Sequence, residues 1–371
     1  MQQTLQLLHE IVWGPWTMLL FLGTGLFFTV KSGGFQIRKL PYWWKKTVGS
    51  LGNGSISSFQ TSCTALAATI GTGNIVGVAT ALTAGGPGAV FWLWISALIG
   101  MATAYAETSL GQKYRYRRPD GTWQCGPMVS MERGLGCRSL GLIYALFAVL
   151  ASLGMGSMVQ ANAVSETLCY EAGMKQEIAA VLVTALTAAV VWGGIRRISR
   201  MTSWFVPLSA GIYFFFSVWA LVVCRRSISV VLGQILKEAW APGAVGGGIA
   251  GFLFSRSVRF GLARGVFSNE AGMGSAAIAS ACASTDSPAR QGYISMTGVV
   301  VDTMLICTVT GLAICCSGVL DSGAEGAALT ILAFRTVLGP LGGVFVSVAV
   351  VLFAFSTILG WEYQGEKRLN I

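Results

Sequence analysis

Four residues inside an apolar stretch, Gly71-Thr72-Gly73-Asn74, have the chemistry to bind a small polar solute. They lie in the middle of 64–82, which is long and apolar enough to cross a membrane. Glycine costs a helix interior up to about 1 kcal/mol relative to alanine, so this pair favours unwound backbone. Unwound backbone offers N–H groups to a carboxylate and carbonyls to an ammonium group or Na⁺. We therefore expect a site for a zwitterion and a cation; the competing interpretation is a glycine-lined contact between helices.

Three acidic residues in or beside apolar segments could act on a cation or on a helix end. Asp302 lies near the middle of an apolar segment, where an acid is costly and usually faces the bundle interior. We expect it to pair with a cation of 244–283, with a place on an ion path as the alternative. Glu107 is expected to snorkel toward Lys113, and Glu270 to cap a helix that restarts after a break.

A second apolar segment, 244–283, is interrupted in the same way as the first. Residues 243–251 are dense in glycine, 255–264 are polar, and an amphipathic helix is expected to resume over 267–275. Two interrupted segments, five spans apart, indicate an inverted-repeat transporter whose site lies between two broken helices.

Composition places the chain in the membrane. The 371 residues are 54% hydrophobic and 11% charged, whereas soluble domains carry roughly 25% charged residues. The net charge of +10 comes from Lys and Arg in short loops between apolar segments, so we expect a lipid bilayer as partner and no nucleic acid. Nine cysteines without a C-x-x-C pair, and one histidine, disfavour a zinc site or a disulfide framework.

The apolar segments predict an all-α polytopic membrane protein with nine spans. These are expected at 11–30, 62–84, 88–110, 141–166, 176–194, 198–224, 244–283, 291–316 and 341–361. The segment 325–338 is too short and too charged to cross, and is expected to form a lid or a re-entrant helix. We expect one transporter domain over 1–371, with an extra helix at 11–30, a first repeat at 62–224 and a partial second repeat at 244–371.

Basic residues predict the orientation. Most Lys and Arg lie in alternate loops, including 31–61 and 111–140, whereas Lys175 and Arg335 fall on the opposite side. The positive-inside rule makes the first set cytoplasmic and places the N-terminus outside. The first ten residues carry no Lys or Arg, so no cleavable signal peptide is expected. We expect a multi-pass protein of a bacterial inner membrane.

Five stretches resemble the alanine or glycine:cation symporter family, the sodium:alanine symporters. They are 33–38, 67–77, 85–107, 267–275 and 353–361. Leu93 stands where the family usually shows Met, and the family has eleven spans, two more than expected here. The resemblance implies the five-plus-five inverted-repeat (LeuT-like) sodium symporter fold with an extra N-terminal helix and an incomplete second repeat.

The resemblance also implies a site. It assigns the N–H groups of Thr72 and Gly73 to a substrate carboxylate, Thr69 to the neighbourhood of the ammonium group, and the Asn74 amide to substrate or ion. Gly71 bounds the same turn. Two further substrate contacts and four Na⁺ ligands complete the implied site: Gln160 and Trp361 for the substrate, and Ala67 and Ile70 carbonyls with Ser356 and Thr357 hydroxyls for the ion.

Each assignment has a structural alternative. Ser356 and Thr357 could bond carbonyls of their own helix, and Gln160 could make a polar contact between helices. Trp361, near the end of its span, could be an anchor at the membrane interface.

The function implied is Na⁺-coupled symport of a small neutral amino acid, alanine or glycine, by alternating access. H⁺ is the less favoured coupling ion because no acid relay crosses the spans. An enzyme is not expected, since the spans hold no acid pair, no G-x-S-x-G and no histidine dyad. The alternative is a truncated, non-transporting membrane protein that retains at most binding or a regulatory role.

Overall fold

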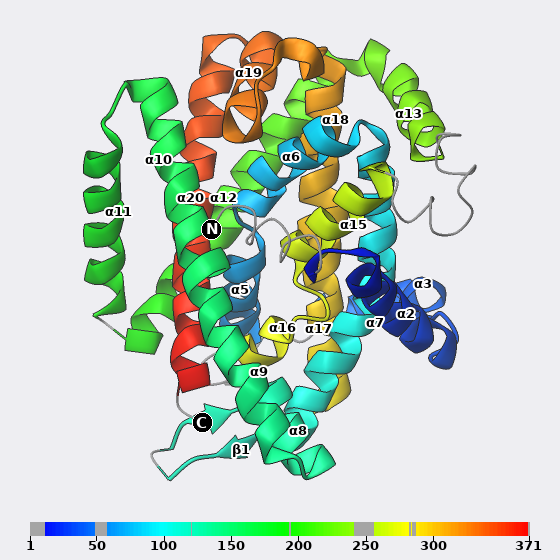
Figure 1. Ribbon diagram of the computed structural model, residues 1–371, viewed down its shortest axis with the longest axis vertical. Coiled ribbons are helices and arrows are strands. Elements are labelled where there is room, and N and C mark those ends of the chain that lie inside the picture. Colours follow the sequence, from blue (N-terminus) through cyan, green and yellow to red (C-terminus); the bar gives the residue numbers. More distant parts are fainter. Residues whose placement is uncertain are drawn as a thin grey trace.

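The computed structural model describes residues 12–48, 58–119, 121–192, 194–240, 256–281, 283 and 287–369. This part is almost entirely helical (Figure 1), which confirms the all-α prediction. The two strands in the described residues, β1 (Tyr116–Arg117) and β2 (Trp123–Gln124), form one short antiparallel hairpin.

The first broken helix matches the prediction at 62–84. It consists of α5 (Ser58–Thr69), a single 3₁₀ turn over Thr72–Asn74, and α6 (Val76–Gly85). The helix therefore breaks at the glycine pair. None of the glycines in this turn has a positive φ, so the break does not depend on a left-handed backbone.

The second broken helix differs from its prediction. α15 (Arg256–Asn269) is continuous through the polar stretch, the break spans 270–274, and α16 (Ser275–Ala279) follows. The expected helix over 267–275 is therefore wrong, and the glycine-dense 243–251 lies outside the described residues. The polar stretch is helical because its apolar and glycine residues recur at helical spacing on one buried face, which includes Val258, Gly261 and Leu262.

α15 ends at Asn269, and three of the next five residues have positive φ angles. Glu270, Gly272 and Gly274 have φ values of 54°, 91° and 78°. Glycine adopts this left-handed region at little cost, whereas for Glu270 it is an uncommon conformation held by the surroundings.

The remaining helices are mostly long. In chain order they are α2 (Pro15–Lys31), α3 (Phe35–Arg38), α4 (Leu40–Val48), α7 (Gly88–Tyr114), α8 (Pro127–Leu135), α9 (Arg138–Ala151), α10 (Val159–Ala172), α11 (Gln176–Val191), α12 (Gly194–Val223), α13 (Arg225–Ala239), α17 (Pro288–Val299), α18 (Thr308–Ser317), α19 (Gly326–Leu338) and α20 (Pro340–Leu369). A π-helical segment, Ser152–Met158, joins α9 to α10, and another, Val300–Cys307, joins α17 to α18.

Five continuous helices in the described part are long and apolar enough to cross a membrane: Gly88–Tyr114, Arg138–Ala172, Arg200–Val223, Pro288–Ser317 and Pro340–Glu362. Of the other four expected spans, those at 11–30 and 176–194 are shorter apolar helices, and the remaining two are the broken ones.

The two broken helices lie side by side and run in opposite directions. In Figure 1, α5 lies below α6, whereas α16 lies below α15, so the chain rises through the first and descends through the second. α15 packs against α6, and α16 packs against α5. The longer helices also pair: α7 packs against α17, and α10 against α20.

α19, which is the expected segment 325–338, is a short helix at the upper end of the bundle (Figure 1). It buries Leu329, Ile331 and Phe334 in the main hydrophobic core, together with residues of α6 and α20. Its Thr330 hydroxyl donates to the Ile75 carbonyl at 3.3 Å, directly after the first break.

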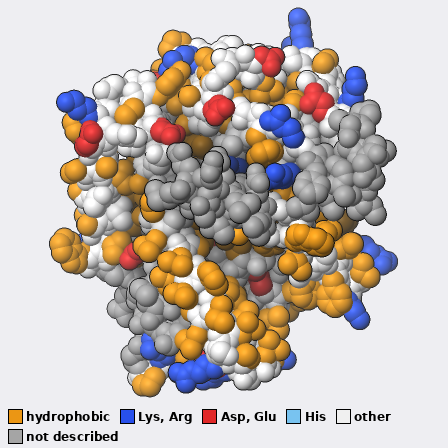
Figure 2. Space-filling view, in the orientation of Figure 1, with side chains coloured by type: hydrophobic (Ala, Val, Ile, Leu, Met, Phe, Trp, Pro, Cys, Tyr) orange, Lys and Arg blue, Asp and Glu red, His pale blue; other side chains and the backbone are white. Residues whose placement is uncertain are grey.

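Side-chain contacts join neighbouring segments at both ends of the bundle. At one end, Arg335 of α19 forms an ion pair with Glu171 of α10. At the other, Gln112 Nε2 and Arg115 Nη1 donate to the carbonyls of Ser280 and Ala283, at 2.5 and 2.8 Å. On the face shown in Figure 2, most acidic side chains lie in the upper half together with several Lys and Arg, and the lower edge also carries Lys and Arg.

Candidate functional site

The first break is a closed, buried turn. The Gly71 N–H donates to Asn74 Oδ1 at 2.9 Å, and the Asn74 N–H donates to the Gly71 carbonyl at 3.2 Å. Thr72 and Gly73 are the first two residues of the 3₁₀ turn, so the turn itself provides no acceptor for their N–H groups. Two N–H groups at the start of a helical turn form an environment that favours a carboxylate.

Gln160 reaches the first break from α10. Thr72 Oγ1 donates to Gln160 Oε1 at 2.8 Å, and Gln160 Nε2 donates to the Met155 carbonyl at 3.2 Å, within the π-helical segment. The side chain is 3% exposed. The structure thus places Gln160 beside Thr72, and it shows the polar contact between helices that the sequence left as an alternative.

The four expected Na⁺ ligands come from α5, from Ile70 directly after it, and from α20, which packs against α5. Thr357 Oγ1 donates to the Ile70 carbonyl at 3.5 Å. Ser356 Oγ instead donates to Phe353 of its own helix at 2.9 Å, so bonding within the helix holds for Ser356. All four residues are buried, including Ala67.

Glycine makes this approach of α20 to α5 possible. A Cβ at Gly360 would lie 2.6 Å from the Ala68 nitrogen, and a Cβ at Gly71 would collide with Thr357 Oγ1. A Cβ at Gly73 would lie 3.4 Å from Ser268 Cα, which is an ordinary contact. Of the two glycines in the turn, Gly71 is therefore the one required by close packing.

Asp302 joins the two broken helices. Its carboxylate accepts from Asn74 Nδ2 at 2.7 Å, on the first break, and from Ser268 Oγ at 2.8 Å, at the end of α15. Thr303 Oγ1 donates to the same carboxylate at 2.8 Å. The expected pairing with a cation of 244–283 is wrong for the described residues, because hydroxyl and amide donors surround the carboxylate instead. Oxygen atoms dominate the cluster, as a hard cation requires.

The second break is held by two side chains from other helices. Glu107 Oε2 accepts from the Gly272 and Gly274 N–H groups at 3.1 and 3.0 Å, so it does not snorkel toward Lys113. Trp361 Nε1 donates to Glu270 Oε1 at 2.9 Å. Trp361 is 1% exposed, which excludes the role of interface anchor. Glu270 thus faces Trp361 from within the break, and the backbone N–H groups there are bonded to Glu107.

A cavity of about 430 Å³ adjoins both breaks. Its inner end is lined by Thr69, Ile70 and Asn269, and its far end by Thr47 of α4 and Gln291 of α17. Thr69 is half-buried, and its hydroxyl donates to Leu66 at 3.3 Å. The cavity is large enough to admit an amino acid to the side of the first break.

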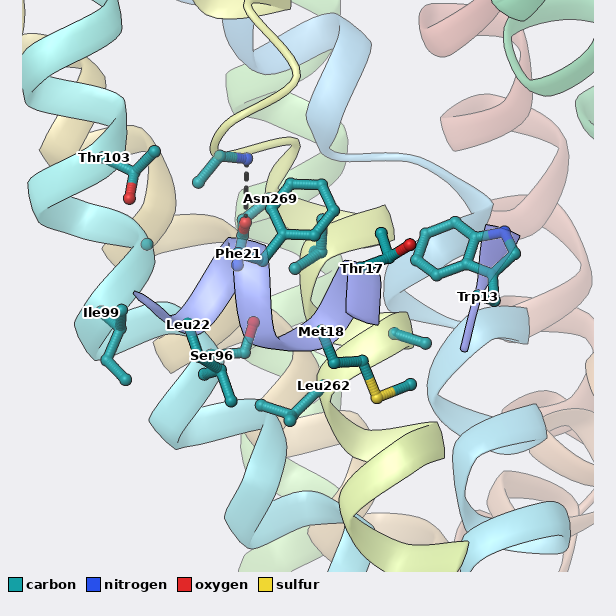
Figure 3. Close-up of a pocket in the computed structure, with 14 residues that line it drawn as sticks. Trp13, Thr17, Met18, Phe21, Leu22, Ser96, Ile99, Thr103, Leu262 and Asn269 are labelled. Atoms are coloured by element: carbon teal, nitrogen blue, oxygen red, sulfur yellow. Dashed lines mark hydrogen bonds between the residues drawn. The ribbon is translucent and has the colours of Figure 1, made fainter. Parts of the chain in front are cut away.

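The N-terminal helix α2 covers the outer side of the second break. Figure 3 shows Phe21 and Leu22 of α2 facing Ile99 of α7 and Asn269 of α15 across a cavity of about 20 Å³. Asn269 Oδ1 accepts from the Ala271 N–H at 3.1 Å there. This second cavity is too small for an amino acid, so it does not provide a second substrate site.

An all-helical bundle with two antiparallel broken helices, joined through buried polar groups, is the architecture of a secondary transporter. The chain belongs to the sodium:alanine symporter family, whose model matches residues 1–371. It is therefore a membrane transporter and not an enzyme, in a family whose coupling ion is Na⁺.

Individual relatives agree with this family. The chain is 43% identical over 374 residues to the sodium/alanine symporter AgcS of Methanococcus maripaludis, a match that covers 97% of this chain and 81% of that protein. It is 43% identical over 373 residues to an uncharacterized transporter of Haemophilus influenzae, covering 99% and 81%. It is 35% identical over 381 residues to the probable sodium/glutamine symporter GlnT of Bacillus subtilis, covering 100% and 78%.

Sequence reasoning missed how Ser268 and Glu107 act at the site. Ser268 stands among small polar residues and carries no signal of its own. Glu107 could have been suspected, because a second interrupted segment rich in glycine frees N–H groups that need a buried acceptor. Asn74 of the first break and Ser268 beside the second break both donate to the Asp302 carboxylate. These contacts could not be predicted from the spacing of the residues along the chain.

Proposed function

We propose that the protein carries a small neutral amino acid, alanine or glycine, across the inner membrane of a bacterium together with Na⁺. The observation that carries this proposal is the buried first break. There, the Thr72 and Gly73 N–H groups are suited to a carboxylate. Shortly before them in the chain, the Ile70 carbonyl lies 3.5 Å from the Thr357 hydroxyl. A zwitterion and a cation bound so close together attract each other, which gives coupling a physical basis.

In this proposal the substrate carboxylate binds the N–H groups of Thr72 and Gly73, with Gly71 bounding the turn. Thr69 lies toward the ammonium group, and Gln160 and Trp361 close the site. Asn74 contributes by holding the turn, since its amide is bonded to Gly71 and Asp302. A small substrate is favoured because the surrounding helices are tightly packed: a Cβ at Gly156 would lie 2.6 Å from Trp361 Cβ.

Na⁺ is proposed to bind the carbonyls of Ala67 and Ile70 and the hydroxyls of Ser356 and Thr357. These groups fit a hard cation, because all four are oxygen donors on buried residues of two packed helices. The cluster around Asp302 is a second set of oxygen donors, and its carboxylate is the group that could carry H⁺ if the coupling ion were a proton.

Alternating access is proposed to arise from two inverted five-helix repeats, one over 62–224 and a partial one over 244–371, after the extra helix at 11–30. The antiparallel broken helices and the pairing of α7 with α17 and of α10 with α20 support this arrangement. The cavity that reaches from Thr69 to Thr47 is proposed to lead to the cytoplasmic side, with the N-terminus outside. The family match along the chain favours a transporter over the non-transporting alternative.

The test is uptake of labelled alanine, glycine and glutamine into proteoliposomes under an inward Na⁺ gradient. We expect alanine or glycine to accumulate against its gradient. Thr357→Ala should raise the Na⁺ concentration for half-maximal uptake by at least tenfold, because it removes one ion ligand. The matched control is Thr336→Ala, a surface threonine of α19 bonded only to its own helix. Unchanged Na⁺ dependence in Thr357→Ala, or uptake driven equally by a proton gradient alone, would overturn the proposed ion site.

A further inference from the structure

One side of α15 combines cations with aromatic rings. Two arginines and two phenylalanines recur there every three or four residues, which places them on one side of the helix: Arg256, Phe260, Arg264 and Phe267. Phe260 lies beside the end of α6, because a Cβ at Gly85 would be 3.1 Å from Phe260 Cβ. Phe267 lies beside the first break, because a Cβ at Gly73 would be 3.5 Å from Phe267 Cδ1. This side of α15 therefore follows α6 from its end to the proposed substrate site.

Arg264 is the inner of the two arginines. Arg256 is exposed, whereas Arg264 is half-buried, so exposure falls along this side of α15 toward the first break. The guanidinium carbon of Arg264 lies 5.6 Å from the centre of the Phe267 ring. An aromatic face attracts a cation electrostatically, but it does not replace the oxygen acceptors that a guanidinium can bind. Phe267 thus holds the cation and leaves its hydrogen-bonding capacity unused.

The Arg264 guanidinium has neither an acid nor a hydrogen-bond acceptor as partner among the residues that the structure describes. Neither of the ion pairs in that part of the chain includes it. The nearby carboxylate of Asp302 accepts from Ser268, one turn further along α15, and does not pair with the arginine. An arginine among membrane helices is costly, and it usually has a partner or a function. A small anion is the partner that this cation lacks.

We propose that Arg264 forms an outer binding station, at which its guanidinium binds the carboxylate of an incoming amino acid before that carboxylate reaches the N–H groups of Thr72 and Gly73. This inference rests on the proposed function. A guanidinium binds a carboxylate through two parallel hydrogen bonds. α15 lies above the second break in Figure 1, on the side that the proposed topology makes external. A cation beside an entry path raises the rate of association more than the final affinity.

The experiment measures alanine binding to the purified full-length protein in Na⁺ by stopped-flow tryptophan fluorescence, which separates association from dissociation. If the parent protein accumulates glycine or glutamine instead, that amino acid is the probe. We expect Arg264→Gln to lower the association rate constant about tenfold and to leave the dissociation rate constant within about twofold of the parent value. Arg264→Lys keeps the charge and should lose no more than about threefold. The matched control is Arg259→Gln, on the same helix but about 140° around its axis, which should associate as the parent protein does.

Three results would overturn this inference and leave the proposed function intact. They are an unchanged association rate in Arg264→Gln, a change confined to dissociation, and an equal loss in Arg264→Gln and Arg264→Lys, which would indicate a structural role. Added salt provides a further test that needs no variant, because screening should slow association to the parent protein. Association that does not depend on salt would also overturn the inference. A parent protein that binds and accumulates none of the three amino acids would refute the proposed function itself, and this inference with it.

Discussion

Asn74 is the residue at which the two broken helices are joined. Its Oδ1 closes the turn on the Gly71 N–H, and its Nδ2 reaches the Asp302 carboxylate at 2.7 Å. Ser268 reaches the other oxygen of that carboxylate from α15. One buried amide therefore sets both the shape of the first break and its distance from the second.

Replacing Asn74 tests this role. Asn74→Ala removes a donor to a buried carboxylate, and leaving such a group unsatisfied costs about 1–3 kcal/mol or more. We expect a clearly lower unfolding midpoint in detergent and a loss of at least tenfold in Na⁺-driven alanine uptake. Asn162→Ala is the control, because Asn162 is exposed and bonds only Glu166. Normal uptake by Asn74→Ala would show that the turn is stable without its amide.

Substitutions of the two glycines of the first break are expected to have different effects. A Cβ at Gly71 collides with the Thr357 hydroxyl, whereas a Cβ at Gly73 meets Ser268 Cα at 3.4 Å. Gly71→Ala should therefore impair Na⁺ dependence strongly, by tenfold or more in the half-maximal concentration. Gly73→Ala should be milder, and Gly73→Val should abolish alanine binding, since a branched side chain fills the space proposed for the carboxylate. Equal effects of the two alanine substitutions would contradict the packing argument.

At the residue scale, the sequence predicted the first break because glycine acts through local backbone preference. It left an interface anchor open for Trp361 and placed Glu107 wrongly, because position along a span says little about depth when a helix extends past the expected end. α20 continues to Leu369, which moves Trp361 from the expected end of its span into the interior of the helix.

Among the elements, the second break depends most on its neighbours. Its backbone N–H groups are satisfied by Glu107 of α7, and Tyr144 of α9 donates to the Met273 carbonyl at 2.7 Å. The loop from Glu270 to Gly274 is thus kept ordered by side chains that lie far away along the chain. Local sequence alone could not locate this break, since the glycine-dense 243–251 was the stronger signal.

Hydrogen–deuterium exchange tests this dependence. Glu107→Ala removes the acceptor of two N–H groups, so peptides covering 265–280 should exchange faster, by an order of magnitude or more. Glu107→Gln keeps a carbonyl oxygen and should show an intermediate rate. Glu132→Ala, at the surface of α8, is the control. Unchanged exchange of these peptides in Glu107→Ala would mean that the loop holds its shape by itself.

For the whole molecule, nine spans were expected, and the described part holds five continuous ones with broken and shorter helices between them. The lengths of the apolar segments predicted where the chain crosses the bundle. They did not predict whether each crossing is one continuous helix or a broken one. The pairing of antiparallel helices arises from contacts between residues more than a hundred positions apart, which no local pattern encodes.

Orientation is the prediction at this scale. The Arg335–Glu171 ion pair joins α19 to the end of α10 at one end of the bundle, and the positive-inside rule predicts that this end is external. Alkaline phosphatase fused after Glu171 should be active, and the same enzyme fused after Arg118 should be silent. The reverse pattern would invert the proposed topology.

Each of the two π-helical segments rotates the helix that follows it about the helix axis, relative to the helix that precedes it. A π turn holds about one residue more than an α turn, and each residue of an α-helix turns the chain by roughly 100°. The side chains of α10 are therefore rotated relative to the face that α9 would present if it continued as an α-helix. Deleting one residue between Ser152 and Met158 would restore a regular helix of nearly the same apolar length, yet it would swing Gln160 away from Thr72. The irregularity in the middle of the span is thus what directs the Gln160 amide toward the first break.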